Sequence, residues 1–163
     1  MSLHIRPVEA QDAAAICQIY NHYIEQSCIT FEEQPVSLQT MEERTSGHPA
    51  THPWLVATIN EQLIGYAYAT PWKTRSAYRF SVETSVYLSH FHVGQGTGKQ
   101  LYLSLIAAIK ASGFHRLNAG IALPNEASIG LHEHLGFIKV AHFTEVGFKH
   151  NRWIDVGYWE KAL

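Results

Sequence analysis

The chain has 163 residues, of which 46% are apolar and 16% charged, and its formal net charge is −2. This length suits a single domain over residues 1–163 with a sizeable core. With no basic excess, neither a nucleic acid nor a membrane surface is expected as a partner. The first residues lack the apolar core of a signal peptide, and Cys17 and Cys28 are too few for a disulfide framework. We therefore expect a cytoplasmic protein.

Hydrophobic periodicity predicts the elements of the first half of the chain. Ala13, Ile16, Cys17 and Tyr20 have the i, i+3, i+4, i+7 spacing of an amphipathic helix. Ser37 is a suitable N-cap for a second helix, because its hydroxyl can accept a hydrogen bond from an unpaired N–H group. In chain order we predict a strand at 5–7, a helix at 10–24, a helix from 37 that stops at 47–49, and strands at 54–59 and 63–69.

Strict alternation marks the middle of the chain. Between Phe80 and Leu88, Val82 and Thr84 share one face while Glu83 lies on the other, which is typical of a long central strand. The pattern as a whole predicts an α+β domain with about seven strands and four helices. The remaining predicted elements are a helix that ends at Gly113, a strand at 116–121, a helix at 125–134, and a hairpin of 137–148 and 153–159 that turns at 150–151.

Three glycines alternate with other residues over 94–98, directly before an apolar helical pattern. A helix N-terminus with a bare backbone favours an anion such as a phosphate. The dinucleotide fingerprint requires a glycine where this chain has Lys99 or Leu101, and the Walker loop requires one where it has Val93. The segment therefore indicates a phosphate site of neither kind.

The segment from Val93 to Lys99 resembles the pyrophosphate loop of the GNAT superfamily of N-acetyltransferases, Gln/Arg-x-x-Gly-x-Gly/Ala. Gly96 and Gly98 occupy the two glycine positions, whereas Val93 replaces the usual Gln or Arg. The segment 125–137 is similar to the superfamily's second cofactor segment. The resemblance implies a GNAT-type fold in α/β/α layers around a mixed, mostly antiparallel sheet. Over nearly the whole chain, the likeness is closest to the phosphinothricin and methionine sulfoximine acetyltransferase branch, and it is carried by 72–80, 81–89, 123–137 and 147–159.

The resemblance implies acetyl-coenzyme A as the acetyl donor. Its pyrophosphate is expected on the N–H groups of the glycine segment, and its pantetheine arm along the edge of the central strand. Asn125 is expected to hold the arm from the other side. The implied coenzyme-binding residues are Val86, Tyr87, Leu88, Gly94, Gln95, Gly96, Thr97, Gly98, Lys99, Asn125 and Ser128.

Two residues are candidates for catalysis. Glu83 is expected to accept the proton of the attacking amine, through a water molecule, because it projects from the strand that contacts the coenzyme. A solvated glutamate on the polar face of a strand is the alternative. His132 stands where many relatives have a tyrosine thought to protonate the departing thiolate. It could serve as that acid, order the cofactor, or simply be satisfied by a nearby carbonyl.

The acceptor is expected to be a small amine with a carboxylate or phosphinate. Lys73, Arg75 and Tyr78 could bind that anion, although a solvated loop is the alternative. Phe31 is a candidate wall of the acceptor site, unless it packs on the core. The resemblance also implies a homodimer. Other functions left open are a protein N-terminal or polyamine acetyltransferase and a non-catalytic coenzyme A sensor.

The chain has eleven histidines, which raises the question of a metal site. His132 and His134 are two residues apart on a predicted helix, so they point to different faces, and no HExxH motif occurs. We therefore predict no metal.

Overall fold

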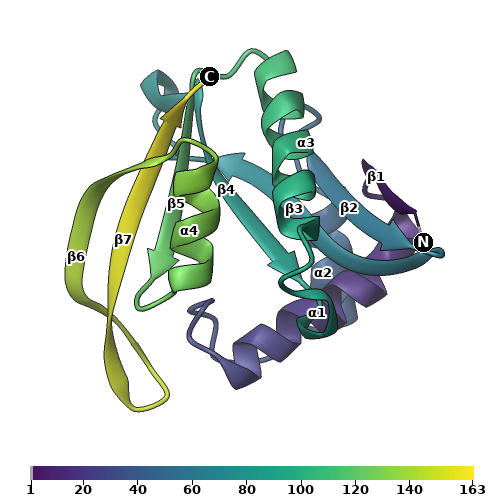
Figure 1. Cartoon of the computed structure of the whole chain (residues 1–163), viewed down its shortest axis with the longest axis horizontal. Helices are drawn as coiled ribbons and strands as arrows, with labels where there is room; N and C mark the ends of the chain where they lie inside the picture. The colour runs from purple at the N-terminus through teal and green to yellow at the C-terminus, as the bar shows by residue number, and fades with distance from the viewer. Residues whose placement is uncertain (1) are drawn as a thin grey trace.

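The computed structural model describes residues 2–163, in which the strands form one seven-stranded sheet (Figure 1). The strand order is β1-β2-β3-β4-β5-β7-β6, and β4 lies at its centre, as the alternation predicted. Neighbouring strands are antiparallel except β4 and β5, which are parallel. The strands are β1 (Leu3–Pro7), β2 (Trp54–Ile59), β3 (Gln62–Pro71), β4 (Ser81–Leu88), β5 (Arg116–Ala122), β6 (Ile138–Lys149) and β7 (Arg152–Ala162).

Helices cover both faces of the sheet, which gives the expected α/β/α layers. Ser37 caps its helix as predicted, because its side chain accepts a hydrogen bond from the Thr40 N–H at 3.1 Å. Gly113 has a φ of +84° just after the long helix, a conformation that favours glycine, and the helix ends there. The α-helices are α1 (Ala13–Gln26), α2 (Leu38–Ser46), α3 (Thr97–Ala111) and α4 (Glu126–His134), with 3-10 turns at Ala10–Asp12, Ser76–Tyr78 and His90–His92.

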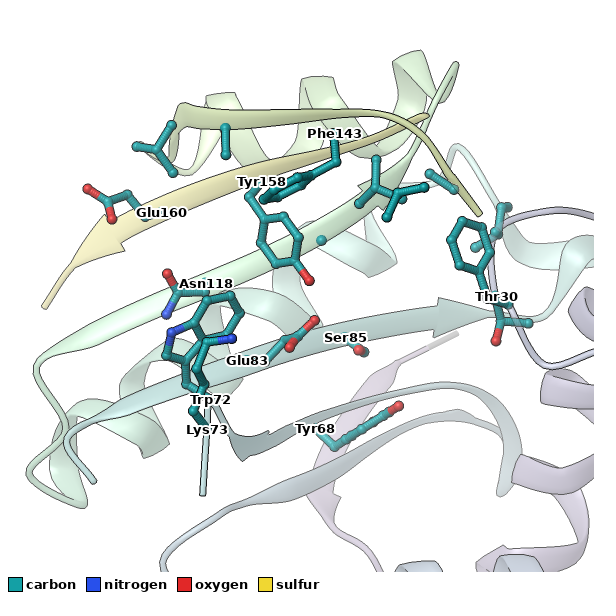
Figure 2. Close-up of a pocket in the computed structure, with 18 of the residues that line it drawn as sticks. Thr30, Tyr68, Trp72, Lys73, Glu83, Ser85, Asn118, Phe143, Tyr158 and Glu160 are labelled. Carbon is teal, nitrogen blue, oxygen red and sulfur yellow. The ribbon is translucent and has the colours of Figure 1, made fainter. Parts of the chain in front are cut away.

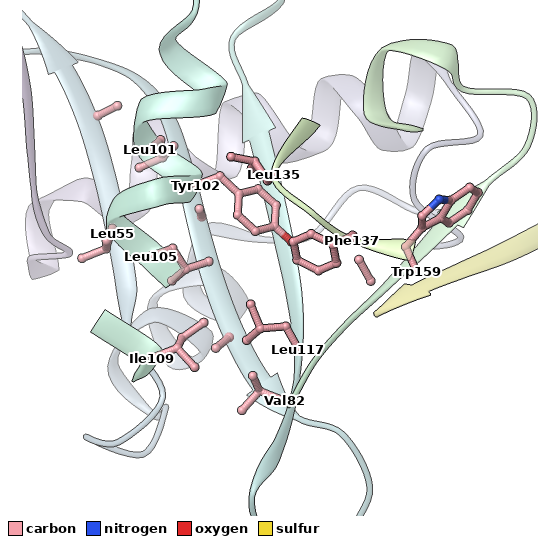
Figure 3. Close-up of a cluster of buried hydrophobic side chains, with 14 of the residues drawn as sticks. Leu55, Val82, Leu101, Tyr102, Leu105, Ile109, Leu117, Leu135, Phe137 and Trp159 are labelled. Atoms are coloured by element: carbon pink, nitrogen blue, oxygen red, sulfur yellow. The ribbon is translucent and has the colours of Figure 1, made fainter. Parts of the chain in front are cut away.

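Two hydrophobic cores lie on opposite faces of the sheet. On one face, Leu101 and Leu105 of α3 pack with Val82 of β4 and Leu117 of β5 (Figure 3). On the other face, α1 and α2 pack on the aromatic side chains of β2 and β3. Because side chains alternate along β4, Val82 points into the first core and Glu83 points to the face that α1 covers.

Hairpin turns fall where the sequence predicted them. Asn60 and Glu61 join β2 to β3, and His150 and Asn151 join β6 to β7, all with positive φ as two-residue turns require. One local interpretation was wrong. The sequence of the helix at 125–134 predicts an apolar face made of Ala127, Leu131 and Leu135, but Ala127 is exposed in α4, and His132 is buried instead.

Candidate active site

The sheet opens at its centre, between β4 and β5. These strands pair only over three positions, from Ser81 opposite Arg116 to Glu83 opposite Asn118. Beyond that point they diverge, and their ends point apart in Figure 1. The peptide groups of β4 that face the opening therefore have no partner strand. We call this opening the gap.

The gap holds a small cavity of about 50 Å³. One side is the divergent part of β4, including Val86 and Tyr87, and the other is β5. Asn125, Ser128 and His132 close it from α4. The predicted coenzyme residues of β4 and α4 are thus brought together, except that the Leu88 carbonyl already accepts a hydrogen bond from the Tyr23 hydroxyl at 2.6 Å.

The glycine segment lies at the start of α3, directly after β4. Gly94 and Gly96 have φ values of +75° and +79°, and Gly96 is the N-cap. No atom lies within 4 Å of where a Cβ would stand at either position, so open space fronts the loop. Gly98 serves a different purpose, because a Cβ there would lie 3.3 Å from Leu88 Cδ1, where the helix approaches β4. The first N–H groups of α3 have no carbonyl in a preceding turn and are available to an anion.

A larger cleft of about 920 Å³ lies on the α1 face of the sheet (Figure 2). We call it the large cleft. It shares five lining residues with the gap cavity, so the two spaces adjoin through the opening in the sheet. The shared residues are Ile29, Ser85, Tyr87, Gly120 and Ala122.

Glu83 lines the large cleft, and Tyr158 of β7 points toward the same space (Figure 2). Burial raises the pKa of the Glu83 carboxyl above its ordinary value, and the positive charge of Lys73 lowers it in part. A carboxylate with a raised pKa holds a proton more readily, so Glu83 is suited to accept one.

His132 is 4% exposed and packs edge-on against the rings of Tyr102 and Phe137. Its Nδ1 lies 2.7 Å from the Ser128 carbonyl oxygen, and since a carbonyl can only accept, Nδ1 carries the hydrogen. Burial lowers the pKa of the imidazole, while that hydrogen bond opposes the shift. At neutral pH the ring is neutral, with an acceptor at Nε2. These contacts agree with the third alternative from the sequence, in which a nearby carbonyl satisfies His132.

The residues predicted to bind the acceptor fall into two groups. Phe31 and Lys73 line the large cleft. Arg75 and Tyr78 do not line it: they lie at the exposed 3-10 turn before β4. Of the three residues predicted to bind the acceptor anion, only Lys73 lines the cleft within one chain.

Sequence reasoning missed several side chains of the large cleft. Asn118 lies opposite Glu83 only because of the register between β4 and β5, which no local pattern indicates. Tyr158 lies between the buried residues Gly157 and Trp159, so the alternation of the strand predicts that it points to the opposite face of the sheet. The alternation does not predict that this face lines the cleft with Glu83. Further examples are Tyr20, Ile29, Thr30, Tyr68, Trp72, Phe143 and Glu160.

Neither a metal cluster nor a membrane span is found in the described chain. Over residues 2–163, no three His, Cys, Asp or Glu side chains come together as a metal site would require. Within the same range, no helix is both long and apolar enough to cross a bilayer.

Comparisons with known proteins agree with this architecture. The sequence profile of the acetyltransferase (GNAT) domain matches residues 5–157. The chain is 42% identical to a phosphinothricin N-acetyltransferase of Streptomyces viridochromogenes, over 98% of this chain and 87% of that protein. It is 34% identical to an L-methionine sulfoximine/L-methionine sulfone acetyltransferase of Salmonella typhimurium, over 98% and 94%.

Solved structures give the same result. A GNAT superfamily phosphinothricin acetyltransferase of Sinorhizobium meliloti, in complex with acetyl-CoA, superposes with a TM-score of 0.95 at 37% identity, over 100% of this chain and 89% of that one. The chain therefore belongs to the GNAT superfamily of acetyltransferases. Within it, the similarity is to the phosphinothricin and methionine sulfoximine acetyltransferases, and the protein is an acetyl-CoA-dependent N-acetyltransferase.

Proposed function

We propose that the enzyme transfers acetyl from acetyl-CoA to the amino group of a small amino-acid-like acceptor of the phosphinothricin, methionine sulfoximine or methionine sulfone type. The observation that supports this most is the position of Glu83, a partly buried carboxylate in the large cleft directly beside the gap. The acceptor amine would enter from the large cleft and the coenzyme from the opposite face. The class of acceptor is supported by the relatives that are named for phosphinothricin and for methionine sulfoximine or sulfone.

The residues around the gap fit coenzyme A. The open space before Gly94 and Gly96 and the free N–H groups of α3 suit a diphosphate. The unpaired edge of β4 at Val86 and Tyr87 suits the amides of a pantetheine arm, as in strand addition. The side-chain oxygen Oδ1 of Asn125 caps α4 by accepting from the Ser128 N–H at 3.1 Å, which leaves the side-chain NH₂ group for the arm.

Glu83 is assigned the role of general base. An α-amino group with a pKa of roughly 8 is mostly protonated at neutral pH and must lose a proton before it can attack. Bound acetyl-CoA supplies a thioester carbonyl for that attack. Glu83 accepts the proton, directly or through water, while burial keeps its pKa raised. As the new C–N bond forms, the C–S bond of the thioester breaks, and its electron pair leaves with the coenzyme thiolate. A base of this kind contributes on the order of 10²–10⁴ in rate.

We assign His132 a positioning role in place of proton donation. Its neutral ring donates to the Ser128 carbonyl and fills the space between Tyr102 and Phe137. The ring contact with Tyr102 holds α4, and with it Asn125, against α3.

The charges of the large cleft favour an anionic amino acid over a polyamine. Lys73 is available to a carboxylate, whereas a polyamine would meet its positive charge. Glu160, the second carboxylate of the cleft, lies 3.6 Å from Arg116 Nη1 and is already paired. Aromatic walls including Phe31 and Tyr158 suit the rest of a small acceptor.

A substrate panel tests this function. Purified protein is incubated with acetyl-CoA and with methionine sulfone, methionine sulfoximine, phosphinothricin, spermidine and an N-terminal peptide, and thiol release is followed. We expect turnover with the first three and little with the others. Tight coenzyme binding without turnover of any amine would instead indicate a sensor domain, and preference for spermidine would point to a polyamine enzyme.

We also propose a homodimer formed through the β6–β7 hairpin. Its surface exposes large apolar side chains, including Ile138, Val146, Phe148 and Trp153, at 50–63% exposure. The rings of Phe148 and Trp153 pack together with their centroids 4.8 Å apart, and exposed apolar surface of this kind marks an interface between chains. Analytical ultracentrifugation should show a dimer that Trp153→Glu converts to a monomer, and a monomeric wild-type protein would contradict the proposal.

A cytoplasmic location is proposed as well. Cys17 and Cys28 are both free thiols, as expected in a reducing compartment. Cell fractionation would test it, and recovery of the protein outside the cytoplasm would contradict it.

A further inference from the structure

One wall of the large cleft is a loop held by a distant hairpin. Residues 27–36 connect α1 to α2, and Ile29, Thr30 and Phe31 from this loop line the cleft. We call it the 27–36 loop. Its far end is fixed to α1, because the Asn21 side chain bonds both the N–H and the carbonyl of Val36, at 2.8 and 3.0 Å. At its near end, the Ser27 hydroxyl donates to the Tyr23 carbonyl oxygen of α1 at 2.7 Å, and the Tyr20 hydroxyl of α1 lies 2.8 Å from the Thr30 hydroxyl.

β6 adds a second set of contacts at the near end, to Thr30 and Phe31. Gly147 is buried, and the Phe31 ring lies directly against it. A Cβ at Gly147 would stand 2.5 Å from Phe31 Cζ, a separation that real Cβ atoms do not adopt. Since Gly147 has no positive φ, its lack of a side chain serves this close approach and not the backbone conformation.

Lys149, two residues further along β6, holds the neighbouring residue. Its side chain is 2% exposed, and Nζ donates to the Thr30 carbonyl oxygen at 2.8 Å. Burial lowers the pKa of this lysine. No carboxylate lies within ion-pair distance of Nζ in the described part of the chain. A buried, unpaired ammonium costs stability, and we therefore ask what its hydrogen bond to Thr30 contributes.

What Lys149 holds faces the large cleft. The Thr30 hydroxyl lies 2.8 Å from the Tyr20 hydroxyl, which also bonds Glu32. Glu32 in turn pairs with Arg44 of α2 through two hydrogen bonds, at 2.7 and 2.8 Å. The Lys149 contact therefore joins the hairpin to a series of polar contacts that begins at the cleft wall with Thr30 and Tyr20 and continues through Glu32 to Arg44 of α2.

A bulge in β6 brings these two residues to the loop. Between Phe143 and Gly147, β6 carries extra residues relative to β7, and Glu145 has a φ of +51°. The Asp155 carboxylate secures the bulge by accepting from the Glu145 N–H at 2.7 Å and from His142 Nε2 at 2.7 Å. Bulges of this kind redirect the side chains that follow them.

We propose that Gly147 determines acceptor selectivity by admitting the Phe31 ring, and that Lys149 positions the same wall by holding Thr30. The proposal rests on the acetyl transfer proposed above. Neither residue lines the large cleft, so both act on the acceptor through the 27–36 loop. The coenzyme side of the gap is not in contact with either of them.

Gly147→Ala tests the first part. The added methyl group must displace the Phe31 ring, so kcat/KM for methionine sulfone should fall about tenfold, the scale of one methyl group in an apolar site, while the KM for acetyl-CoA stays unchanged. In a Phe31→Leu background the same substitution should change kcat/KM less than about twofold, since the overlap is gone. Gly130→Ala is the control, because Gly130 is exposed and its Cβ would meet nothing within 4 Å. An equal loss in both backgrounds would overturn the role of Gly147.

Lys149→Met tests the second part with a readout independent of catalysis. Methionine fills similar space without the donor, and replacing a buried charge by an apolar group is tolerated by the fold. Amide hydrogens at 29–32 should exchange faster, and the KM for methionine sulfone should rise with that for acetyl-CoA unchanged. Lys110→Met, at an exposed site on α3, should alter neither.

The outcomes separate the two proposals. If the wild-type protein acetylates no amine, the proposed function fails, yet the exchange measurement still examines the contact between Lys149 and the 27–36 loop. If wild-type exchange and Lys149→Met exchange are equal, the positioning role is overturned whatever the kinetics show.

Discussion

The two sides of the gap differ in the groups that line them, which are backbone groups on one side and side chains on the other. The side proposed for the coenzyme consists mainly of backbone: an unpaired strand edge at Val86 and Tyr87 and a helix start preceded by two left-handed glycines. The large cleft consists mainly of side chains, which come from the 27–36 loop, β3, β4, β5, β6 and β7. A backbone site depends on conformation, whereas a side-chain site depends on which residues meet. Substitutions should therefore affect the two sides differently.

The largest expected effect is on the side-chain site. Glu83→Gln keeps the shape of the residue but cannot accept a proton, so kcat should fall on the order of 10²–10⁴. The coenzyme side does not use this carboxylate, and the Kd for acetyl-CoA from calorimetry should stay within about twofold. Undiminished turnover would remove Glu83 from the role of base. A parallel loss of coenzyme affinity would show that the two sides are not separable.

The next effect is on the backbone site. Gly96→Val places a β-branched residue at a φ of +79°, which costs of order 1–3 kcal/mol and weakens acetyl-CoA binding roughly 5- to 150-fold as the loop rearranges. Gly113→Val is the matched control, because its φ is +84° and its Cβ would also meet open space, but it lies at the other end of α3. Both variants should lose stability and only Gly96→Val should lose affinity. Equal affinities would separate the glycine segment from the coenzyme.

The smallest effect concerns pH. The Lys73 charge lowers the pKa of Glu83, so Lys73→Met should raise that pKa further. Because the carboxylate form is the active base, the acid limb of the kcat/KM profile should move to higher pH, and activity should be lost earlier on acidification. Lys110→Met, on the exposed side of α3, serves as the control. A limb that stays in place would mean that another group controls it.

The same contrast explains what could be predicted from the sequence. The glycine segment, the Ser37 cap and the positions of both hairpin turns were predictable, because each is decided within a few residues. Asn125 was expected inside the helix and is instead its N-cap. The bounds of β2 also match the prediction. Local sequence signals predict backbone conformation, and the proposed coenzyme site consists mainly of backbone groups. It was therefore the more predictable side of the gap.

The large cleft was only partly predictable. Phe31 and Lys73 line it as expected, but Arg75 and Tyr78 lie outside it, because their position depends on how the exposed segment before β4 turns. The burial of His132 and the contact of Lys149 with Thr30 join residues far apart in the sequence. The periodicity of the sequence does not predict contacts of this kind, because they depend on strand register and on the bulge in β6.

The unpaired edge of β4 has a thermodynamic consequence for the free enzyme. Any molecule that occupies the gap in the folded chain, and not in the unfolded one, shifts the folding equilibrium. At a hundred times its Kd, the donor would add about 2.7 kcal/mol to the free energy of unfolding. For a chain of this size that corresponds to a rise in melting temperature of roughly 5–10 °C. The heat resistance of this enzyme in the cell would then follow the supply of its donor.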